Sequence, residues 1–386
     1  MLPKAEAAYF AIADISGYTN FLAAVELDHA QDIIADFMDT VVKALRPPFR
    51  LAKFEGDAAF VYSTAEKLDG SLLQDAIEGA YFKFRRRLRS VRQASTCECQ
   101  ACAAMPGLDF KFVVHHGEMV KQKMGGREEL AGRDVILVHR LLKNTLAEKI
   151  GGRAYALYSD AAIRAMGVDP AAQGLIAHRE NIEIIGEVTL WARDLEAAWK
   201  QEDARARMEV TRADAFATLA YDIAAPRQIV WEYLTVPGQW QKWWDADAIV
   251  EESAKGRRGV GTNNHCMHGD HTNIEETVDW RPADYFTASI TLPVPGAPRI
   301  VMTRALSDNP DGTTHLEFRV ARPKPKDKAF VEGAAGKFGE RMDRAMAHLR
   351  SMVEGGRPAV SAMEEPALTP SSGRFLAEPV KAGGGR

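Results

Sequence analysis

The stretch that most constrains the fold runs from Ala11 to Phe21, with the sequence AIADISGYTNF. Its apolar start predicts a buried strand that ends at Asp14, followed by a tight turn and the start of a long helix. A carboxylate at a strand end can bind a cation, while the N–H groups and the positive dipole end of a helix attract an anion. In the simpler interpretation, Asp14 only caps the helix. A second acidic turn further along the chain decides between the ion-binding interpretation and the capping interpretation.

The length and the composition predict two domains without a membrane span. The chain has 386 residues, more than one typical domain, and 46% of them are hydrophobic. A net charge of −4 predicts no general attraction for nucleic acid or for anionic membranes. No signal-peptide pattern and no apolar run of roughly 20 residues is found, so we expect a cytoplasmic protein. Its four cysteines are then expected to be reduced or metal-bound.

The first half is predicted to be an α+β, ferredoxin-like sandwich. After the opening turn, apolar residues at helical spacing continue to Leu45, and Pro47 and Pro48 end the helix. Further elements are a hairpin with a Glu-Gly-Asp turn (50–62), a helix (72–91), a strand pair with His115-His116-Gly117 at its bend (108–123) and a helix from 135 onward. The order β-α-β-β-α-β-β-α predicts antiparallel strands joined through helical crossovers.

Four blocks in this half carry a specific resemblance. They read DISGYT from Asp14, KFEGD from Lys53, HHGE from His115 and GRDVILVHR from Gly132. In this order, residues 1–198 resemble the class III adenylate/guanylate cyclase catalytic domain. Together with the cysteine cluster described below, the blocks also resemble a divergent bacterial cyclase-like family of unassigned function.

The resemblance implies a nucleotide site with two divalent ions. Asp14 and Asp57 match the aspartates that hold the Mg²⁺ or Mn²⁺ pair in that family. The implied substrate is a purine nucleoside triphosphate, whose phosphates would be cradled by the backbone of Ile15, Ser16, Gly17, Tyr18 and Thr19.

The same resemblance implies roles for three further side chains. Lys53 matches the base-selecting lysine, Glu129 occupies the place of the second purine-selecting residue, and Arg140 matches the arginine that stabilises charge on the reacting phosphate. In that family the metal aspartates and this arginine come from opposite subunits. The resemblance therefore implies a homodimer.

One position departs from the family pattern. The transition-state asparagine falls on Ile136, whose side chain can form no hydrogen bond. Loss of one such donor commonly costs about 10²–10³ in rate. Asn144 lies on the same helical face as Arg140 but eight residues from the expected position, so we interpret it as a capping or surface residue. Weak or absent cyclase activity is therefore expected, and whether the chain is an enzyme stays open.

A cysteine cluster, Cys97, Cys99 and Cys102, lies between the helix at 72–91 and the next strand. Thiolates at this spacing can bind Zn²⁺ or an iron–sulfur cluster, with His115 or His116 as candidates for a fourth ligand. The alternative is a reduced cluster on a loop that binds no metal.

The second half is predicted to be a helix-grip domain. A polar linker helix at 199–206 comes first. It is followed by a strand, a helix opened by Ala225-Pro226, six further strands and a long helix from Lys328. Residues 207–355 resemble the START/polyketide-cyclase-like (SRPBCC) superfamily, which implies an antiparallel sheet around the long helix and a cavity for an apolar or lipid-like ligand. The histidines at 265–271 are interpreted as hairpin or pocket-lining residues. Residues 356–386 are expected to form a disordered tail.

Three functions remain open on the sequence alone. The first is a cyclase-like signalling or sensor protein that binds nucleotide and metal, with a second domain for a hydrophobic ligand and with weak or no turnover. The second is an active cyclase regulated by the helix-grip domain. The third is a carrier of a lipid or another small apolar ligand, with the first half as a dimerisation scaffold.

Overall fold

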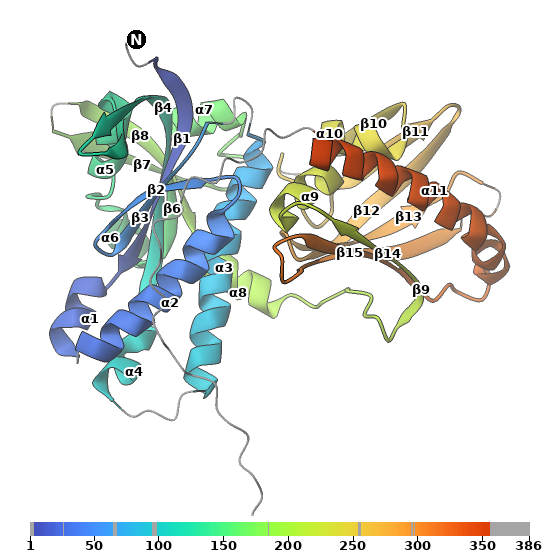
Figure 1. The fold of residues 1–386 in the computed structure, drawn as a ribbon, viewed down its shortest axis with the longest axis horizontal. Coiled ribbons are helices and arrows are strands. Elements are labelled where there is room, and N and C mark those ends of the chain that lie inside the picture. Colours follow the sequence, from blue (N-terminus) through green and yellow to red (C-terminus); the bar gives the residue numbers. More distant parts are fainter. Residues whose placement is uncertain are drawn as a thin grey trace, which may run out of the picture.

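The computed structural model describes residues 4–25, 27–64, 68–94, 99–183, 185–253, 256–294, 296 and 298–355. These residues form two units that lie side by side, each with its own sheet and helices (Figure 1). The α+β class predicted from the sequence is confirmed. Across the described ranges, no helix has the length and apolar character needed to cross a membrane. Cys97 and the predicted tail at 356–386 lie outside the described residues.

The first unit is built on an eight-stranded sheet with the order β2-β3-β1-β4-β6-β8-β7, and β5 pairs with β4 off this path. The β4–β6 pair is parallel, and the other pairs are antiparallel. The strands are β1 (Glu6–Ser16), β2 (Arg50–Glu55), β3 (Ala58–Ser63), β4 (Asp109–Met124), β5 (Arg127–Ala131), β6 (Tyr155–Ser159), β7 (Ile176–Ile182) and β8 (Gly186–Asp194).

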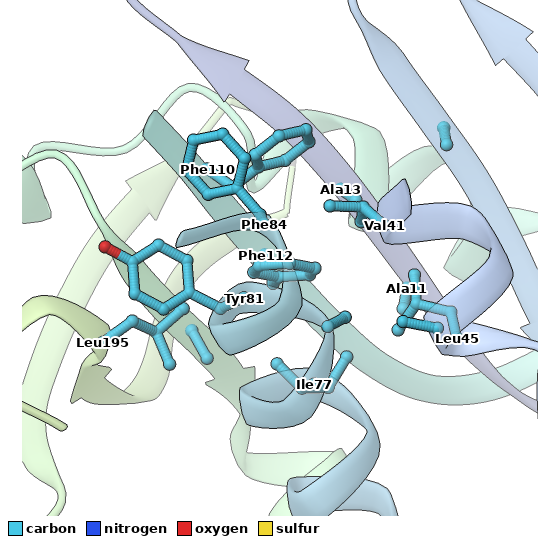
Figure 2. Packing of buried hydrophobic residues seen from close by; sticks show 14 of the residues in the cluster. Ala11, Ala13, Val41, Leu45, Ile77, Tyr81, Phe84, Phe110, Phe112 and Leu195 are labelled. Carbon is cyan, nitrogen blue, oxygen red and sulfur yellow. The ribbon is translucent and has the colours of Figure 1, made fainter. Parts of the chain in front are cut away.

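Helices cover both faces of this sheet, so the central strand β1 is buried on both sides and reads as one apolar run. Its Ala11 and Ala13 face a core that includes Phe84 and Phe110, whose ring centroids are 4.9 Å apart (Figure 2). The helices are α1 (Tyr18–Ala24), α2 (Leu27–Leu45), α3 (Gly70–Ala94), α4 (Gln100–Ala104), the 3₁₀ turn η1 (Met105–Gly107), α5 (Arg133–Arg140), α6 (Leu146–Ile150), α7 (Asp160–Met166) and α8 (Leu195–Ala204).

The helix predicted after the opening turn is divided in two. Helix α1 has 7 residues and ends at Ala24, and the extended backbone of the next residue, Val25 (φ −138°, ψ 164°), breaks the helical path before α2 begins at Leu27. The prediction of one long helix is therefore wrong. Apolar spacing predicts helical residues well, but it does not show where a backbone turns between two helices.

The predicted bend at His115 is also wrong, because β4 continues through it as one strand of 16 residues. Strand β1 pairs along β4 from the Glu6–Met119 pair to the Ser16–Asp109 pair. Any side chain at Gly117 would collide with the carboxylate of Asp134. The Gly in the His-His-Gly-Glu block thus makes room for a carboxylate instead of making a turn.

The second unit is a helix-grip fold, as predicted. Its seven-stranded antiparallel sheet has the order β10-β11-β12-β13-β14-β15-β9, and the long helix α11 crosses one face (Figure 1). The elements are β9 (Ala215–Ile223), α9 (Arg227–Thr235), α10 (Pro237–Trp244), β10 (Ala248–Glu252), β11 (Asn263–His268), β12 (His271–Arg281), β13 (Tyr285–Thr291), β14 (Arg299–Asp308), β15 (Thr314–Ala321) and α11 (Lys328–Gly355).

The polar helix predicted to join the halves has a packing role that its polar sequence does not predict. Trp199 of α8 is buried in the core of the first unit, 5.7 Å between ring centroids from Phe82 of α3. After α8 the chain runs along the outer face of the second sheet. There the Met208 N–H donates to Asp279 (2.8 Å) and the Val210 N–H donates to the Thr303 hydroxyl (2.8 Å).

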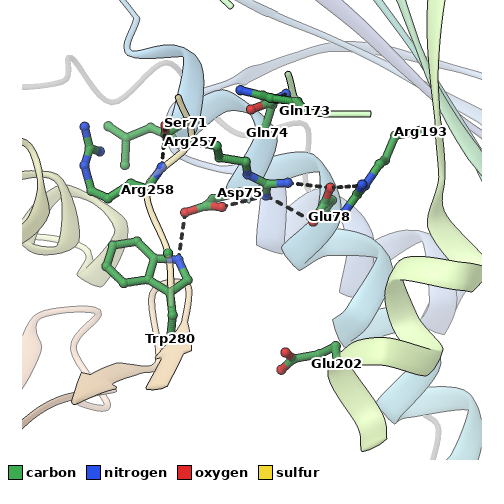
Figure 3. Close-up of polar contacts among 12 residues, drawn as sticks. Ser71, Gln74, Asp75, Glu78, Gln173, Arg193, Glu202, Arg257, Arg258 and Trp280 are labelled. Atoms are coloured by element: carbon green, nitrogen blue, oxygen red, sulfur yellow. Dashed lines mark hydrogen bonds and ion pairs between the residues drawn. The ribbon is translucent and has the colours of Figure 1, made fainter. Parts of the chain in front are cut away.

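A buried network of ion pairs joins the two units (Figure 3). Arg257 of the second unit donates to Asp75 (2.8 Å) and to Glu78 (2.7 Å) on α3, and Arg193 donates to Glu78 (3.1 Å). Burial raises the pKa of Asp75 to about 6. Burial would also raise the pKa of Glu78, but the charges of Arg257 and Arg193 lower it. The carboxylates of Asp75 and Glu78 thus depend on Arg257 from across the contact.

Candidate metal and nucleotide site

Asp14 and Asp57 lie together where β1 ends and the β2–β3 turn begins. Asp14 pairs with Ala58 in the sheet, and the Ile15 N–H donates to the Asp57 carbonyl at 3.1 Å. Burial and then the negative charge of Asp14 raise the pKa of Asp57. The Nζ of Lys111 lies 3.4 Å from an oxygen of Asp14 and partly offsets this charge. Two crowded carboxylates with one nearby ammonium favour the binding of a further cation.

The oxygen donors suit Mg²⁺ or Mn²⁺. Mg²⁺ is usually held by one or two carboxylates, with water and substrate phosphates completing its shell. Asp14 and Asp57 supply that number. Among the described residues, no group of three or more His, Cys, Asp or Glu side chains could hold a metal by itself. Two carboxylates leave coordination positions for water and for substrate phosphates, so Asp14 and Asp57 fit a metal that arrives with a nucleotide.

The turn after Asp14 is held by backbone geometry. Gly17 has φ 89°, in the left-handed region, and a Cβ there would lie 3.0 Å from the carbonyl oxygen of Gly107, so a glycine is required. Gly17 also precedes α1 without a side-chain cap, which means that the capping interpretation of Asp14 is wrong. The Ser16 hydroxyl donates to the Arg153 carbonyl at 3.0 Å. Phosphate binding by residues 15–19 stays a prediction.

Lys53 and Glu129, predicted to select the base, face each other across β2 and β5. The Lys53 Nζ is 3.6 Å from a Glu129 oxygen and 3.0 Å from a Glu55 oxygen. The hydrogen bond to Glu55 is the main cause that raises the pKa of Lys53. The other Glu55 oxygen lies 2.9 Å from Nε2 of His139. The sequence motifs did not single out Glu55 or His139, although both lie inside matched blocks.

A groove of about 690 Å³ brings Lys53 and Arg140 to one surface. The guanidinium of Arg140 donates to the carbonyl of Glu183 at 3.1 Å. Ile136 also lines the groove and is 58% exposed, which is unusual for isoleucine. The remaining lining residues are Glu55, Val135, His139, Lys143, Asn181, Ile182 and Glu183. The position that the resemblance matches to the transition-state asparagine is therefore an open apolar surface.

Asn144 does not replace that donor. Its amide nitrogen donates to the Leu141 carbonyl at 2.8 Å. Its amide oxygen accepts hydrogen bonds from the Leu146 N–H (3.1 Å) and from the Tyr155 hydroxyl (3.0 Å). The interpretation of Asn144 as a capping residue is confirmed.

The described part of the cysteine cluster begins α4. The Cys102 N–H lies 3.4 Å from Sγ of Cys99, which caps the helix, and Cys97 lies outside the described residues. His115 is not available as a further ligand, because its ring nitrogens bond to Ser159 (2.7 Å) and Asp134 (3.3 Å). The ring of His116 packs on Tyr9, 4.6 Å between centroids. Zn²⁺ or iron–sulfur binding stays a prediction.

The concave face of the second sheet is not uniformly apolar. Arg304 and Glu275 form a buried ion pair of 2.8 Å, and the guanidinium lies over the rings of Trp240 and Phe286. Cys266 is fully buried near this pair. His265 points to the opposite face of β11, as strand alternation requires, and the His268–His271 pair closes the β11–β12 hairpin. The hairpin interpretation of this segment is confirmed.

The fold and the site thus define two classes of domain, a cyclase-like sandwich with paired aspartates and a helix-grip domain. Residues 205–354 match the family described as polyketide cyclase / dehydrase and lipid transport, which confirms the resemblance predicted for that half. Residues 34–149 match a family described as protein of unknown function (DUF2652).

Among curated proteins, an uncharacterized protein of Mycobacterium tuberculosis is 39% identical over 111 residues. The match covers 29% of this chain and 51% of that protein, so the chain spans about half the length of this relative.

Among solved structures, the adenylyl cyclase CyaB from P. aeruginosa is 16% identical and covers 50% of this chain and 99% of its own, with a TM-score of 0.37. The guanylyl cyclase Cya2 is 14% identical, with coverages of 50% and 93% and a TM-score of 0.36. A protein from Mesorhizobium loti is 19% identical, with coverages of 34% and 95% and a TM-score of 0.29.

Proposed function

We propose that this chain is a cyclase-like sensor that binds a purine nucleotide with Mg²⁺ or Mn²⁺ and carries a second domain for an apolar ligand. The observation that carries the proposal is the contrast between two parts of the first unit. Asp14 and Asp57 are crowded, and the charge of Asp14 helps to raise the pKa of Asp57. Ile136, in contrast, exposes an apolar side chain at the donor position. Binding of a nucleotide with its metal ion is thus supported more strongly than cyclase turnover.

Asp14 and Asp57 would hold the metal. A bound divalent ion supplies charge neutralisation for the nucleotide phosphates. Lys111 lies 3.4 Å from Asp14 and would have to withdraw or turn toward a phosphate when the ion binds. This competition favours metal binding only when nucleotide phosphates arrive with the ion.

Lys53 and Glu129 would read the edge of the purine. An ammonium and a carboxylate 3.6 Å apart offer one donor and one acceptor on the same surface. Glu55 holds Lys53 in place from the other side, at 3.0 Å. Arg140 would contact a phosphate only after leaving the Glu183 carbonyl.

A homodimer would bring the metal aspartates of one copy together with Arg140 of the other. Apolar side chains are exposed on β2, α5 and the end of β4, where Phe54 is 45%, Ile136 58% and Met124 58% exposed. Phe54 lies on the edge strand β2, next to Lys53 of the groove that Ile136 lines, and exposed apolar side chains are typical of an interaction surface. We propose that a second copy of the chain covers them and completes the nucleotide site.

Calorimetry tests the binding proposal. Titration of ATP and of GTP into the full chain with millimolar Mn²⁺ should give saturable heat with one of them. Asp14→Ala should abolish it, whereas Asp39→Ala, an exposed residue that pairs with Lys43, should not. Absence of nucleotide binding to the parent chain, or equal binding by Asp14→Ala, would contradict the proposal.

The second candidate is an active cyclase, favoured by the presence of Lys53 and Arg140 in one groove. A turnover assay of the parent beside Ile136→Asn distinguishes the two. Activity in the variant alone would identify a binding site that lacks one donor. Activity of the parent above an Asp57→Ala control would establish the enzyme.

A further inference from the structure

A crevice of about 60 Å³ lies between the two units, away from the aspartates and the groove. A cavity needs roughly 10–15 Å³ to hold one water, so this one has room for a small polar group. One wall is a face of α3, and the other is formed by α9 and by the turn that follows β12. The α3 wall has residues at helical spacing, namely Leu72, Asp75, Ala76, Gly79 and Lys83.

Gly79 leaves the crevice open. A Cβ built at this position would have no heavy atom within 4 Å. The residue lies inside α3, where glycine costs about 1 kcal/mol relative to alanine. No left-handed backbone requires a glycine at this position. The glycine therefore maintains space beside Lys83.

Two donors on opposite walls lack partners. Nε1 of Trp231 on α9 is buried and has no hydrogen bond, and Trp231 is 2% exposed. Within the described residues, no hydrogen bond or ion pair reaches Nζ of Lys83 on α3, and this side chain is half-buried. Burial and then the charge of Arg227 lower the pKa of Lys83. A buried indole N–H without a partner, beside an ammonium that forms no hydrogen bond, favours an acceptor from outside the chain.

The nearby carboxylates are already bound elsewhere. Arg227 donates to Asp284 at 2.9 Å and its Nε lies 3.1 Å from Asp308. Asp75 is bound by Arg257 and by Trp280. Asp284 and Asp308 also act on the charge of Lys83, but neither forms an ion pair with its Nζ, so a ligand can still bind there.

We propose that this crevice binds a short-chain aliphatic monocarboxylate, with its carboxylate between Lys83 and Trp231 and its chain against the apolar wall. One ammonium balances one negative charge, and the carboxylates of Asp75 and Glu232 on the walls disfavour a dianion such as phosphate. The rest of the lining is mainly apolar, including Pro47, Pro48, Leu68, Ile229 and Pro282.

The site goes beyond the proposed nucleotide function because it uses neither Asp14 nor Asp57. A ligand bonded to Lys83 of one unit and Trp231 of the other ties α3 to α9. It thereby stabilises the contact between the cyclase-like unit and the helix-grip unit.

Calorimetry with butyrate on the full chain tests the proposal, with butyramide as a neutral analogue and inorganic phosphate as a dianion. Butyrate should bind saturably, and the other two should bind at least about tenfold more weakly, a difference of roughly 1.4 kcal/mol. Lys83→Met should weaken butyrate binding to the same extent. The matched control Lys43→Met, on an exposed part of α2, should leave it unchanged.

A second pair of variants tests the place of binding. Gly79→Leu should fill the crevice and remove butyrate binding, whereas Gly79→Ala should retain it, and thermal unfolding will show that both variants fold. No saturable binding to the parent, stronger binding of phosphate, or equal butyrate affinity in Lys83→Met or Gly79→Leu would overturn the proposal. Because the nucleotide titration uses other residues, failure of either proposal leaves the other standing.

Discussion

The indole N–H of Trp280 on β12 donates to the carboxylate of Asp75 on α3 at 3.2 Å, across the contact between the two units (Figure 3). The same carboxylate accepts from Arg257 at 2.8 Å. A residue in the cyclase-like unit is therefore held by a tryptophan whose ring packs on Trp231 inside the helix-grip unit, 4.8 Å between centroids. This arrangement links the interior of one unit to the helix α3 of the other.

Asp75 should make stability rise as the pH falls. Its pKa is raised to about 6 in the folded chain, from an ordinary value of 3.8, so the folded state binds the proton more tightly between these values. From pH 7 to pH 5 this group should add about 1 kcal/mol to the free energy of unfolding. Burial lowers the pKa values of His115 and His116. These two groups therefore make the free energy of unfolding decrease as the pH falls.

The difference between the parent chain and Asp75→Asn isolates this effect, since both proteins retain the histidines. Chemical denaturation at several pH values should show that the variant loses the added stability at pH 5. An identical pH profile for the two proteins would contradict the assignment.

Loss of Arg257 should be much more costly than loss of a surface arginine. Arg257→Met leaves the carboxylates of Asp75 and Glu78 buried without this partner, which typically costs about 3–5 kcal/mol. The control Arg164→Met breaks an exposed pair with Asp160 and should cost less than about 1 kcal/mol. Equal denaturation midpoints for the two variants would show that the network contributes little.

Gly117→Ala should destabilise the first unit because the added methyl group would overlap Asp134. Displacement of Asp134 also breaks its hydrogen bonds with the Glu118 N–H (2.8 Å) and His115 (3.3 Å), so we expect a cost of about 2 kcal/mol or more. Gly79→Ala, which meets no atom within 4 Å, is the matched control. Thermal unfolding should give a lower midpoint for Gly117→Ala than for Gly79→Ala. A midpoint of Gly117→Ala equal to that of the parent chain would contradict the close approach of Asp134 to Gly117.

Lys111→Met should increase the affinity for Mn²⁺ in the presence of nucleotide. The ammonium lies 3.4 Å from Asp14 and competes with a cation there. Its removal should strengthen metal binding by roughly tenfold, or about 1.4 kcal/mol. Weaker metal binding by this variant would instead make Lys111 a contact for the phosphates.

Phe54→Glu should weaken self-association. The side chain is 45% exposed on β2, and a charge at an apolar contact is costly to bury. Analytical ultracentrifugation should detect a shift toward monomer. Met208→Glu, at a residue that is 54% exposed and lies beyond α8, should keep the assembly of the parent. A monomeric parent chain would contradict the proposed dimer.

Much of the fold could be predicted because its signals are local. The antiparallel strands of the second unit and the helix from Lys328 follow from alternating and helical spacing, and the structure contains them. The paired turns at Asp14 and Asp57 could be recognised from their motifs. Their proximity then followed from the antiparallel pairing of β1 with β3.

The rest depends on contacts between distant residues. Gly117 looks like a turn residue, and only the approach of Asp134 from α5 explains it as part of a strand. Likewise, Arg257 and Asp75 are 182 positions apart, and neither neighbourhood carries a recognisable pattern. Buried ion pairs between units are fixed by docking geometry, which single-sequence periodicity does not encode.

The claim that Asp14 and Asp57 form a metal site for a nucleotide is tested most directly by Mn²⁺ electron paramagnetic resonance. Addition of the nucleotide should convert the signal of free Mn²⁺ to a protein-bound signal in the parent chain, and Asp57→Asn should remove that conversion. Equal conversion by the parent and by Asp57→Asn, or none in the parent, would contradict the proposed site.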